Sequence, residues 1–205
     1  MKQDRRELIA RTALQVLASG GARALTHRAV DTRAALPAGS TSYYFRSRTA
    51  LLRACVDDLA AQDHAQLDLV APLLAAADAE TLGKVLADVL LRWLSTDRER
   101  HIARYELSLE TLRRPELAEA LHRSGTAIRG RVADVLAGLG ASDPSGQAQW
   151  LVACLDGILF DRLVGANAGA AVDREEIAAA TRRLTALVLE PAWDPAPGGG
   201  PLNAP

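Results

Sequence analysis

Small, hydroxyl, aromatic and basic side chains gather between residues 38 and 48, and their chemistry suits contact with nucleic acid. The segment 38–42, Ala-Gly-Ser-Thr-Ser, allows the backbone to approach DNA closely, and its hydroxyls can donate to phosphates or base edges. Tyr43-Tyr44-Phe45 supplies two polar-tipped rings and one apolar ring, which together can bridge a protein core and a DNA backbone. Arg46 and Arg48 add positive charge for phosphates. The segment therefore predicts a DNA-binding surface.

Two short helices must position these side chains. Thr26 is suited to capping the first helix by accepting a bond from a free backbone N–H, and Leu25 and Val30 have the spacing of a hydrophobic staple. The helix is expected to end near Arg33. Pro37 favours a new helix start, because its missing N–H would be unsatisfied there anyway. Two short helices joined by a tight turn predict a helix-turn-helix, in which the second helix enters the major groove.

Residues 26–52 resemble the signature of the TetR family of transcriptional regulators. The family pattern, T-x-x-x-(I/V)-A-x-x-A-G-V-(S/P)-x-G-T-(L/T)-Y-(Y/H)-(Y/H)-F-x-(S/N)-K-x-x-L-(L/I), falls on this segment without a gap. The matching residues are Thr26, Val30, Ala34, Gly39, Thr41, Tyr43, Tyr44, Phe45, Ser47, Leu51 and Leu52.

Three departures from the pattern matter. Ala35 replaces the turn glycine, and alanine at positive φ costs roughly 1–2 kcal/mol, which favours an adjusted turn. Ser42 stands where many members carry a tyrosine, so one aromatic phosphate contact is expected to be absent. Arg48 replaces lysine, and arginine can bind phosphate through two parallel bonds.

The resemblance implies an all-α protein of about nine helices. A three-helix DNA-binding domain is expected over residues 1–47 and a ligand-binding and dimerisation domain over residues 48–190. By the same resemblance, phosphates are expected to contact Thr26, Arg28, Tyr44 and Arg48. The residues expected closest to the bases or the adjoining backbone are Ala38, Gly39, Ser40, Thr41 and Tyr43.

Composition and charge agree with this class of protein. Hydrophobic residues make up 49% of the 205 residues and aromatics only 4%, a mixture that favours helices. Residues 1–53 hold ten Lys and Arg against three Asp and Glu, a net charge of +7, and the remaining residues carry −8. Such asymmetry indicates a nucleic-acid-binding part on an acidic remainder. No apolar run reaches the roughly 20 residues of a membrane span, and we expect a cytoplasmic protein.

Apolar periodicity predicts the remaining helices. They are expected at residues 4–19, from 47 onward, and at 80–94, 98–112, 115–139, 147–164 and 174–189, with a stop at Pro72. The helix over 147–164 is apolar almost all round, so more than one side must be buried. The simplest explanation is a homodimer through 147–164 and 174–189, although burial within one chain remains an alternative. The tail 191–205 is rich in proline and glycine and is predicted to be disordered.

The sequence predicts no enzyme, no metal site and no cofactor. Four histidines show no metal-ligand spacing with carboxylates, and no phosphate-binding, dinucleotide or nucleophile motif occurs. Glu106 and Glu110 lie four residues apart, but Arg113 and Arg114 lie within a turn, so ordinary helix salt bridges are the preferred interpretation.

A small-molecule pocket is expected in the second domain, as the resemblance implies. Its candidate lining residues are Trp93, Tyr105, Trp150, Asp156 and Phe160. Asp156 is expected to be buried, where it would meet a cationic or hydroxylated ligand or a structural arginine. The predicted function is a homodimeric repressor that a ligand releases from a pseudo-palindromic operator. The alternative is a DNA-binding regulator without a small-molecule ligand, either constitutive or controlled by a protein partner.

Overall fold

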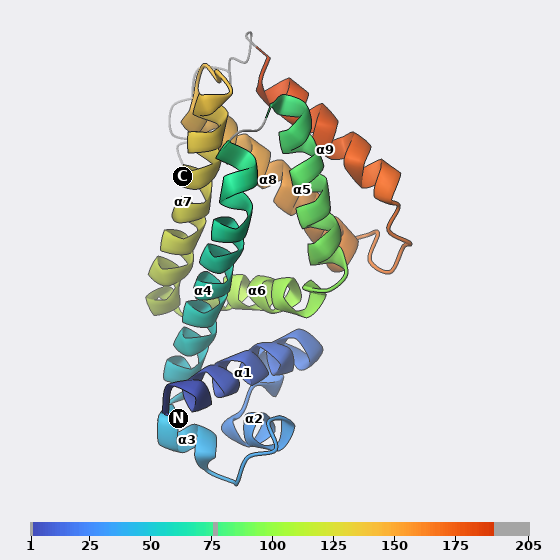
Figure 1. The fold of residues 1–205 in the computed structure, drawn as a ribbon. Coiled ribbons are helices and arrows are strands. Elements are labelled where there is room, and N and C mark those ends of the chain that lie inside the picture. The colour runs from blue at the N-terminus through green and yellow to red at the C-terminus, as the bar shows by residue number, and fades with distance from the viewer. Residues whose placement is uncertain (1, 76–77, 191–205) are drawn as a thin grey trace, which may run out of the picture.

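The computed structural model describes residues 2–75 and 78–190, which form nine helices and no strand (Figure 1). The all-α prediction is confirmed over these residues, whereas the predicted disorder of 191–205 lies outside them. The helices are α1 (Lys2–Ala24), α2 (His27–Arg33), α3 (Ser40–Tyr44), α4 (Arg48–Ala75), α5 (Ala79–Leu94), α6 (Arg98–Thr111), α7 (Pro115–Gly138), α8 (Pro144–Leu163) and α9 (Arg174–Val188).

The helices form two parts, which we call the head (residues 2–47, α1–α3) and the body (residues 48–190, α4–α9). In Figure 1 the head lies at the bottom, and α4 rises from it with α7 at its side. The short α6 crosses the molecule between the head and the rest of the body, while α5, α8 and α9 complete the upper part. The division at residue 47 stays a prediction.

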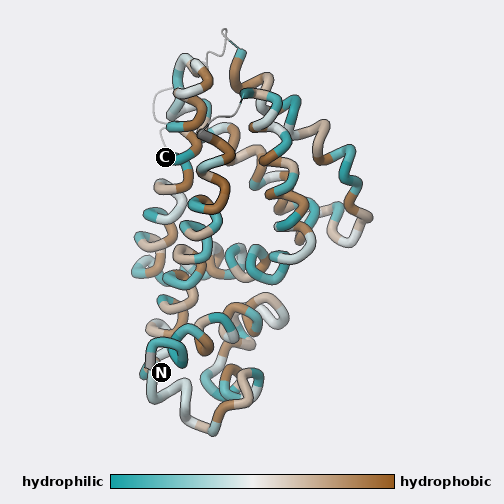
Figure 2. Tube along the Cα trace, viewed as in Figure 1, coloured by the Kyte–Doolittle hydropathy of each residue, from teal (hydrophilic) through white to brown (hydrophobic). Residues whose placement is uncertain are grey.

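Two apolar clusters fill the interior, and α6 contributes to both. The head cluster joins α1, α2 and the first turns of α4, and Ala103 and Leu107 of α6 belong to it. The body cluster joins α5, α7, α8 and α9, and Ile102 and Tyr105 of α6 pack against it. Figure 2 shows brown residues along α4 and α5. Because its two faces serve different cores, α6 connects the head mechanically to the body.

The end of α1 is interrupted by a glycine. Gly21 has φ 69° and ψ −176°, a conformation that is essentially restricted to glycine. The helix that the sequence predicts to stop at this point does break, although helical turns resume as far as Ala24. The chain therefore changes direction just before it enters the helix-turn-helix.

Three details of the prediction need correction. α4 continues past Pro72 to Ala75, so the predicted stop is wrong; a proline in the last turn removes one helical bond from a helix that is nearly finished. α3 begins at Ser40 and not at Pro37. Ala35 keeps φ 52°, so the expected adjustment of the turn does not occur. The bond from the Leu36 N–H to the Asp31 carbonyl, 2.9 Å long, helps to hold this tight turn.

Candidate nucleic-acid interface and effector site

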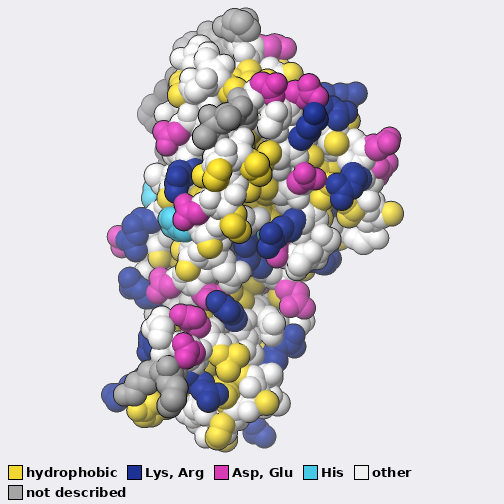
Figure 3. Space-filling view, in the orientation of Figure 1, with side chains coloured by type: hydrophobic (Ala, Val, Ile, Leu, Met, Phe, Trp, Pro, Cys, Tyr) yellow, Lys and Arg dark blue, Asp and Glu magenta, His cyan; other side chains and the backbone are white. Residues whose placement is uncertain are grey.

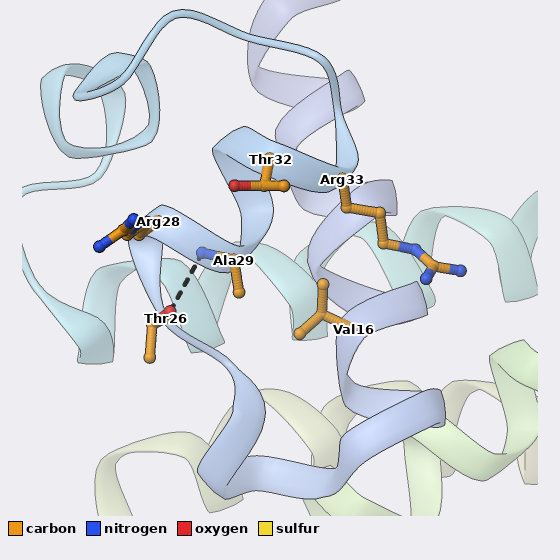
Figure 4. A pocket seen from close by; sticks show the side chains of 6 residues that line it. All are labelled: Val16, Thr26, Arg28, Ala29, Thr32 and Arg33. Carbon is orange, nitrogen blue, oxygen red and sulfur yellow. Dashed lines mark hydrogen bonds between the residues drawn. The ribbon is translucent and has the colours of Figure 1, made fainter.

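The start of α2 has the predicted cap. Thr26 has extended backbone geometry, and its hydroxyl accepts a 3.1 Å bond from the Ala29 N–H (Figure 4). The exposed Arg28 projects from the same turn and points away from Arg33, which donates to Gln15 of α1 across 3.3 Å. The free end of α2 thus presents a hydroxyl, a cation and backbone N–H groups, which is the combination that binds phosphate.

Asp31 fixes the position of α3. Its carboxylate is almost fully buried and accepts three bonds, from the Gly39 N–H (2.8 Å), the Thr41 N–H (2.8 Å) and the Thr41 hydroxyl (2.6 Å). Burial alone would raise the pKa of Asp31, but the bonds from Thr41 and Gly39 prevail and lower it. The carboxylate therefore stays charged and replaces the helical bonds that the first residues of α3 lack.

The outer face of α3 is open to a partner. Tyr43 is 71% exposed and its ring meets Tyr44 edge to face at 5.1 Å, while Ser42 is exposed as well. Ala38 and Gly39 are exposed in the turn before the helix, and the half-buried Ser40 donates to the Pro37 carbonyl. The surface that the sequence predicts for bases is thus accessible at these positions.

Two predicted DNA contacts have structural partners instead. Thr41 is fully buried, and its hydroxyl proton is used on Asp31. Arg48, at the first position of α4, donates to the carbonyls of Ala22 and Leu25. Both side chains hold the head together in this arrangement, and their predicted contacts with DNA stay predictions.

The residues predicted to line the effector pocket lie in three separate places. Tyr105 and Phe160 meet edge to face at 5.1 Å, and the Tyr105 hydroxyl donates to the Asp156 carboxylate across 3.0 Å. Arg104 forms an ion pair with the same carboxylate. The Asp156 side chain is 44% exposed, so the expectation of a buried carboxylate is wrong, because α8 turns this residue toward the edge of α6. The structural arginine partner foreseen for Asp156 is present.

Trp93 lies in a second polar group, about one turn of α6 before the first. Its indole N–H donates to Gln66 across 3.0 Å, and its ring lies 4.6 Å from the ring of His101. Arg100 donates to Asp63 (2.9 Å) and to the same Gln66 (3.0 Å). His101 is only 3% exposed, and neither ring nitrogen has a partner among the described residues. Burial, followed by the charges of Arg100 and Arg104, lowers the pKa of His101 to about 2, so the ring is neutral.

Trp150 does not join these groups, because it is 51% exposed on the outer face of α8. Residues on this face recur at intervals of three and four. After Trp150 they are Ala153, Gly157, Phe160 and Val164, all exposed. The opposite face carries the buried Leu151, Leu155 and Leu159. A helix with an apolar stripe on each side is suited to two partners at once.

The described part of the chain has no cluster of three or more His, Cys, Asp or Glu side chains that could hold a metal ion. None of the described helices combines the length and apolar character needed to span a bilayer. In the space-filling view, dark blue basic side chains border the head at the lower end of the molecule (Figure 3).

The head is therefore a helix-turn-helix of the kind that binds DNA, carried on a separate helical body. Residues 77–187 match the family described as tetracyclin repressor-like, C-terminal domain. Together with the solved structures below, this match shows that the chain belongs to the TetR family of transcriptional regulators. No curated protein matches the sequence significantly.

Solved structures support the same assignment. The multidrug binding protein EbrR, complexed with ethidium, is 32% identical over 90% of this chain and 99% of its own, with a TM-score of 0.64. A TetR-family member from Streptomyces coelicolor A3 is 32% identical over 88% and 97%, with a TM-score of 0.66. A putative TetR-family regulator from Mesorhizobium loti is 17% identical over 91% and 96%, with a TM-score of 0.76, and supports the fold alone.

Sequence reasoning did not single out Asp31 or His101. Asp31 carried a usable signal, since the family pattern has alanine at that position and a carboxylate next to the motif's buried valine needs partners. His101 carried none, because its surroundings come from helices distant in the sequence. Of the two glutamates assigned to helix salt bridges, Glu110 does pair with Arg114 at 3.5 Å, whereas Glu106 accepts its bond from the Ala22 N–H of the head.

We predict that Asp31→Asn lowers the free energy of unfolding by about 2 kcal/mol at pH 7. The NH2 group of the asparagine would face one of the N–H or O–H donors and could not accept its hydrogen bond. A lowered pKa means that Asp31 stabilises the fold above its ordinary value of 3.8 and loses this contribution as the pH falls through the lowered value. The difference between the two proteins should therefore shrink as the pH falls below 3.8, as measured by urea denaturation followed by circular dichroism.

Asp57→Asn, at an exposed position of α4, is the matched control and should change stability little at either pH. Equal stability of Asp31→Asn and the natural protein at pH 7 would show that the three bonds do not hold α3.

Proposed function

We propose that this chain is a homodimeric, non-enzymatic, DNA-binding repressor that leaves a pseudo-palindromic operator when a small molecule binds its body. The observation that carries the proposal is the rigid presentation of α3. Asp31 holds its buried side through Thr41, while Tyr43 is exposed on the opposite side. A five-residue helix fixed in this way can enter a major groove without first becoming ordered.

Charge supports DNA as the partner. Residues 1–53 carry a net charge of +7 within a chain whose total is −1, so the attraction to phosphate is concentrated at the head. Two heads related by a two-fold axis would contact half-sites separated by about one helical turn or a multiple. Arg28 and the capped end of α2 would bind the backbone, and the outer face of α3 would contact bases.

The dimer is proposed to form through the outer apolar face of α8, together with α9. Trp150 and Phe160 are about half exposed on this face, and Leu187 of α9 is exposed too. Ala153 and Gly157 between the two rings are small, so a second α8 could approach closely. A repeat of three and four residues is the spacing that packs one helix against another.

The effector is proposed to be a planar aromatic cation. Tyr105 and Phe160 offer ring edges and faces beside the half-exposed Asp156 carboxylate, and a cationic ligand could take the place of Arg104 on it. The similar protein EbrR has been solved with ethidium, with proflavin and with imidazole. The unpartnered His101 ring adds a donor and an acceptor within the same body.

The DNA contacts are tested with Arg28→Ala. Fluorescence anisotropy on DNA from immediately upstream of the protein's own gene, with scrambled DNA beside it, should give weaker binding to both. The slope of log affinity against log salt should fall by about 1, because one phosphate contact is lost. Arg129→Ala removes the same charge from an exposed position of α7. If both variants changed DNA affinity equally, the DNA would not bind at α2.

The dimer is tested with Ala153→Arg, which introduces like charges on the outer face of α8. Sedimentation velocity should show a dimer dissociation constant raised at least tenfold, since juxtaposed like charges cost several kcal/mol, roughly. Ala65→Arg makes the same substitution at an exposed position of α4 and should leave the dimer intact. An unchanged dimer in Ala153→Arg would assign the second copy to another surface.

The effector is tested with proflavin, whose fluorescence polarisation is followed on the protein without DNA because such dyes also bind DNA. Asp156→Asn should weaken binding about tenfold through the loss of a charged partner. Asp134→Asn, on the exposed side of α7, should bind as the natural protein does. Absence of binding by proflavin, ethidium and imidazole alike would favour a regulator without a small-molecule ligand.

A further inference from the structure

The connection between head and body contains one residue, Ala22, whose backbone N–H and backbone carbonyl are both bonded to body helices. The Ala22 N–H donates to the Glu106 carboxylate of α6 across 3.0 Å. The Ala22 carbonyl accepts from Arg48, the first residue of α4, which also donates to the Leu25 carbonyl. Two body helices thus hold the same residue through its two backbone groups, immediately before the helix-turn-helix begins.

Gly21 makes this grip possible. Its φ of 69° turns the chain so that the Ala22 N–H faces α6, and a Cβ at Gly21 would lie only 3.2 Å from the Glu106 carboxylate. The backbone angle therefore favours glycine strongly, and a Cβ would in addition crowd the Glu106 carboxylate. The glycine, the glutamate and the arginine come from three different helices and meet at one point of the chain.

The stability of α1 does not explain why the Glu106 carboxylate lies at the end of that helix. The carbonyl end of a helix carries partial negative charge, so an acidic side chain at the end of α1 is disfavoured by the helix dipole. The Arg48 guanidinium on the other side of the peptide offsets that cost. Glu106 therefore serves the contact between α6 and the head, and not the stability of α1 itself.

The other side of α6 faces the proposed effector site. Arg104 and Tyr105 contact Asp156 of α8, while Glu106, one residue later, contacts the head. A shift of α6 that follows a change at Asp156 would therefore move the acceptor that holds Ala22. Two sites are coupled when both bias the same structural element.

We propose that Glu106 is a positioning residue that sets the orientation of the DNA-binding head on the body through its bond to Ala22. In a dimer this orientation determines the separation of the two α3 helices. Glu106 thereby determines which spacing of half-sites the protein accepts. The inference rests on the proposed function of the head as a DNA-binding unit.

The test compares Glu106→Ala with Glu106→Gln. Both remove the charge, but the glutamine amide retains an oxygen that can accept from Ala22. Glu99→Ala, at an exposed position of the same helix, is a further control for charge. The operator is first obtained by selection from a pool of random DNA duplexes, and affinity is then measured for it and for a copy with one base pair inserted at its centre.

We expect Glu106→Ala to reduce the preference for the original spacing about fivefold, the factor that the loss of one such bond can produce. Glu106→Gln and Glu99→Ala should keep the natural preference. A general loss of stability would lower both affinities and leave their ratio unchanged. An unchanged ratio in Glu106→Ala, or an equal change in Glu106→Gln, would overturn the inference.

Amide hydrogen exchange at Ala22, followed by NMR on the full chain without DNA, gives a second measure. Exchange should accelerate at least about tenfold in Glu106→Ala and stay near the natural rate in Glu106→Gln. Unchanged exchange in Glu106→Ala would overturn the inference as well. Failure of the selection to enrich any DNA would count against the proposed function, and the exchange measurement would still decide the role of Glu106.

Discussion

The Asp31 carboxylate and its three bonds determine the shape of the DNA-binding surface. Helix α3 has only five residues, far fewer than a helix needs to be stable alone in water. The preceding turn includes Ala35 at positive φ, which costs free energy by itself. Both features are tolerated because the Gly39 and Thr41 N–H groups and the Thr41 hydroxyl all bond to Asp31. The exposed position of Tyr43 depends on this buried charge.

Helix α6 has a comparable role for the whole molecule. Leu107 lies in the head cluster and Tyr105 packs on the body cluster, so neither core can rearrange without affecting this helix. Its polar side chains are divided in the same way, with Glu106 toward the head and Arg104 toward α8. His101 is buried, neutral and without a partner among the described residues.

The separation of the functional surfaces follows from these two arrangements. The head presents α2 and α3 away from the body, and the exposed stripe of α8 lies on the body (Figure 1). The DNA-binding surface shares no residue with the other two, whereas Phe160 lies both on the outer face of α8 and beside Tyr105, so the proposed dimer and effector surfaces meet there. The head contacts the body through α6, through Leu117 of α7 and through the first turn of α4, where Arg48 holds the Ala22 and Leu25 carbonyls.

The sequence by itself determined the elements whose causes are local. The Thr26 cap, the break at Gly21 and the periodic apolar faces depend on neighbours within one or two turns, and the structure confirms the all-α fold that they predict. Only the tertiary structure decided where the polar side chains point. Thr41 is turned inward by Asp31, Asp156 is half exposed beside Arg104, and Glu106 meets a peptide 84 residues away in sequence. Such partners cannot be inferred from local spacing, because a side chain's direction on a short helix depends on which other helix supplies its hydrogen bond.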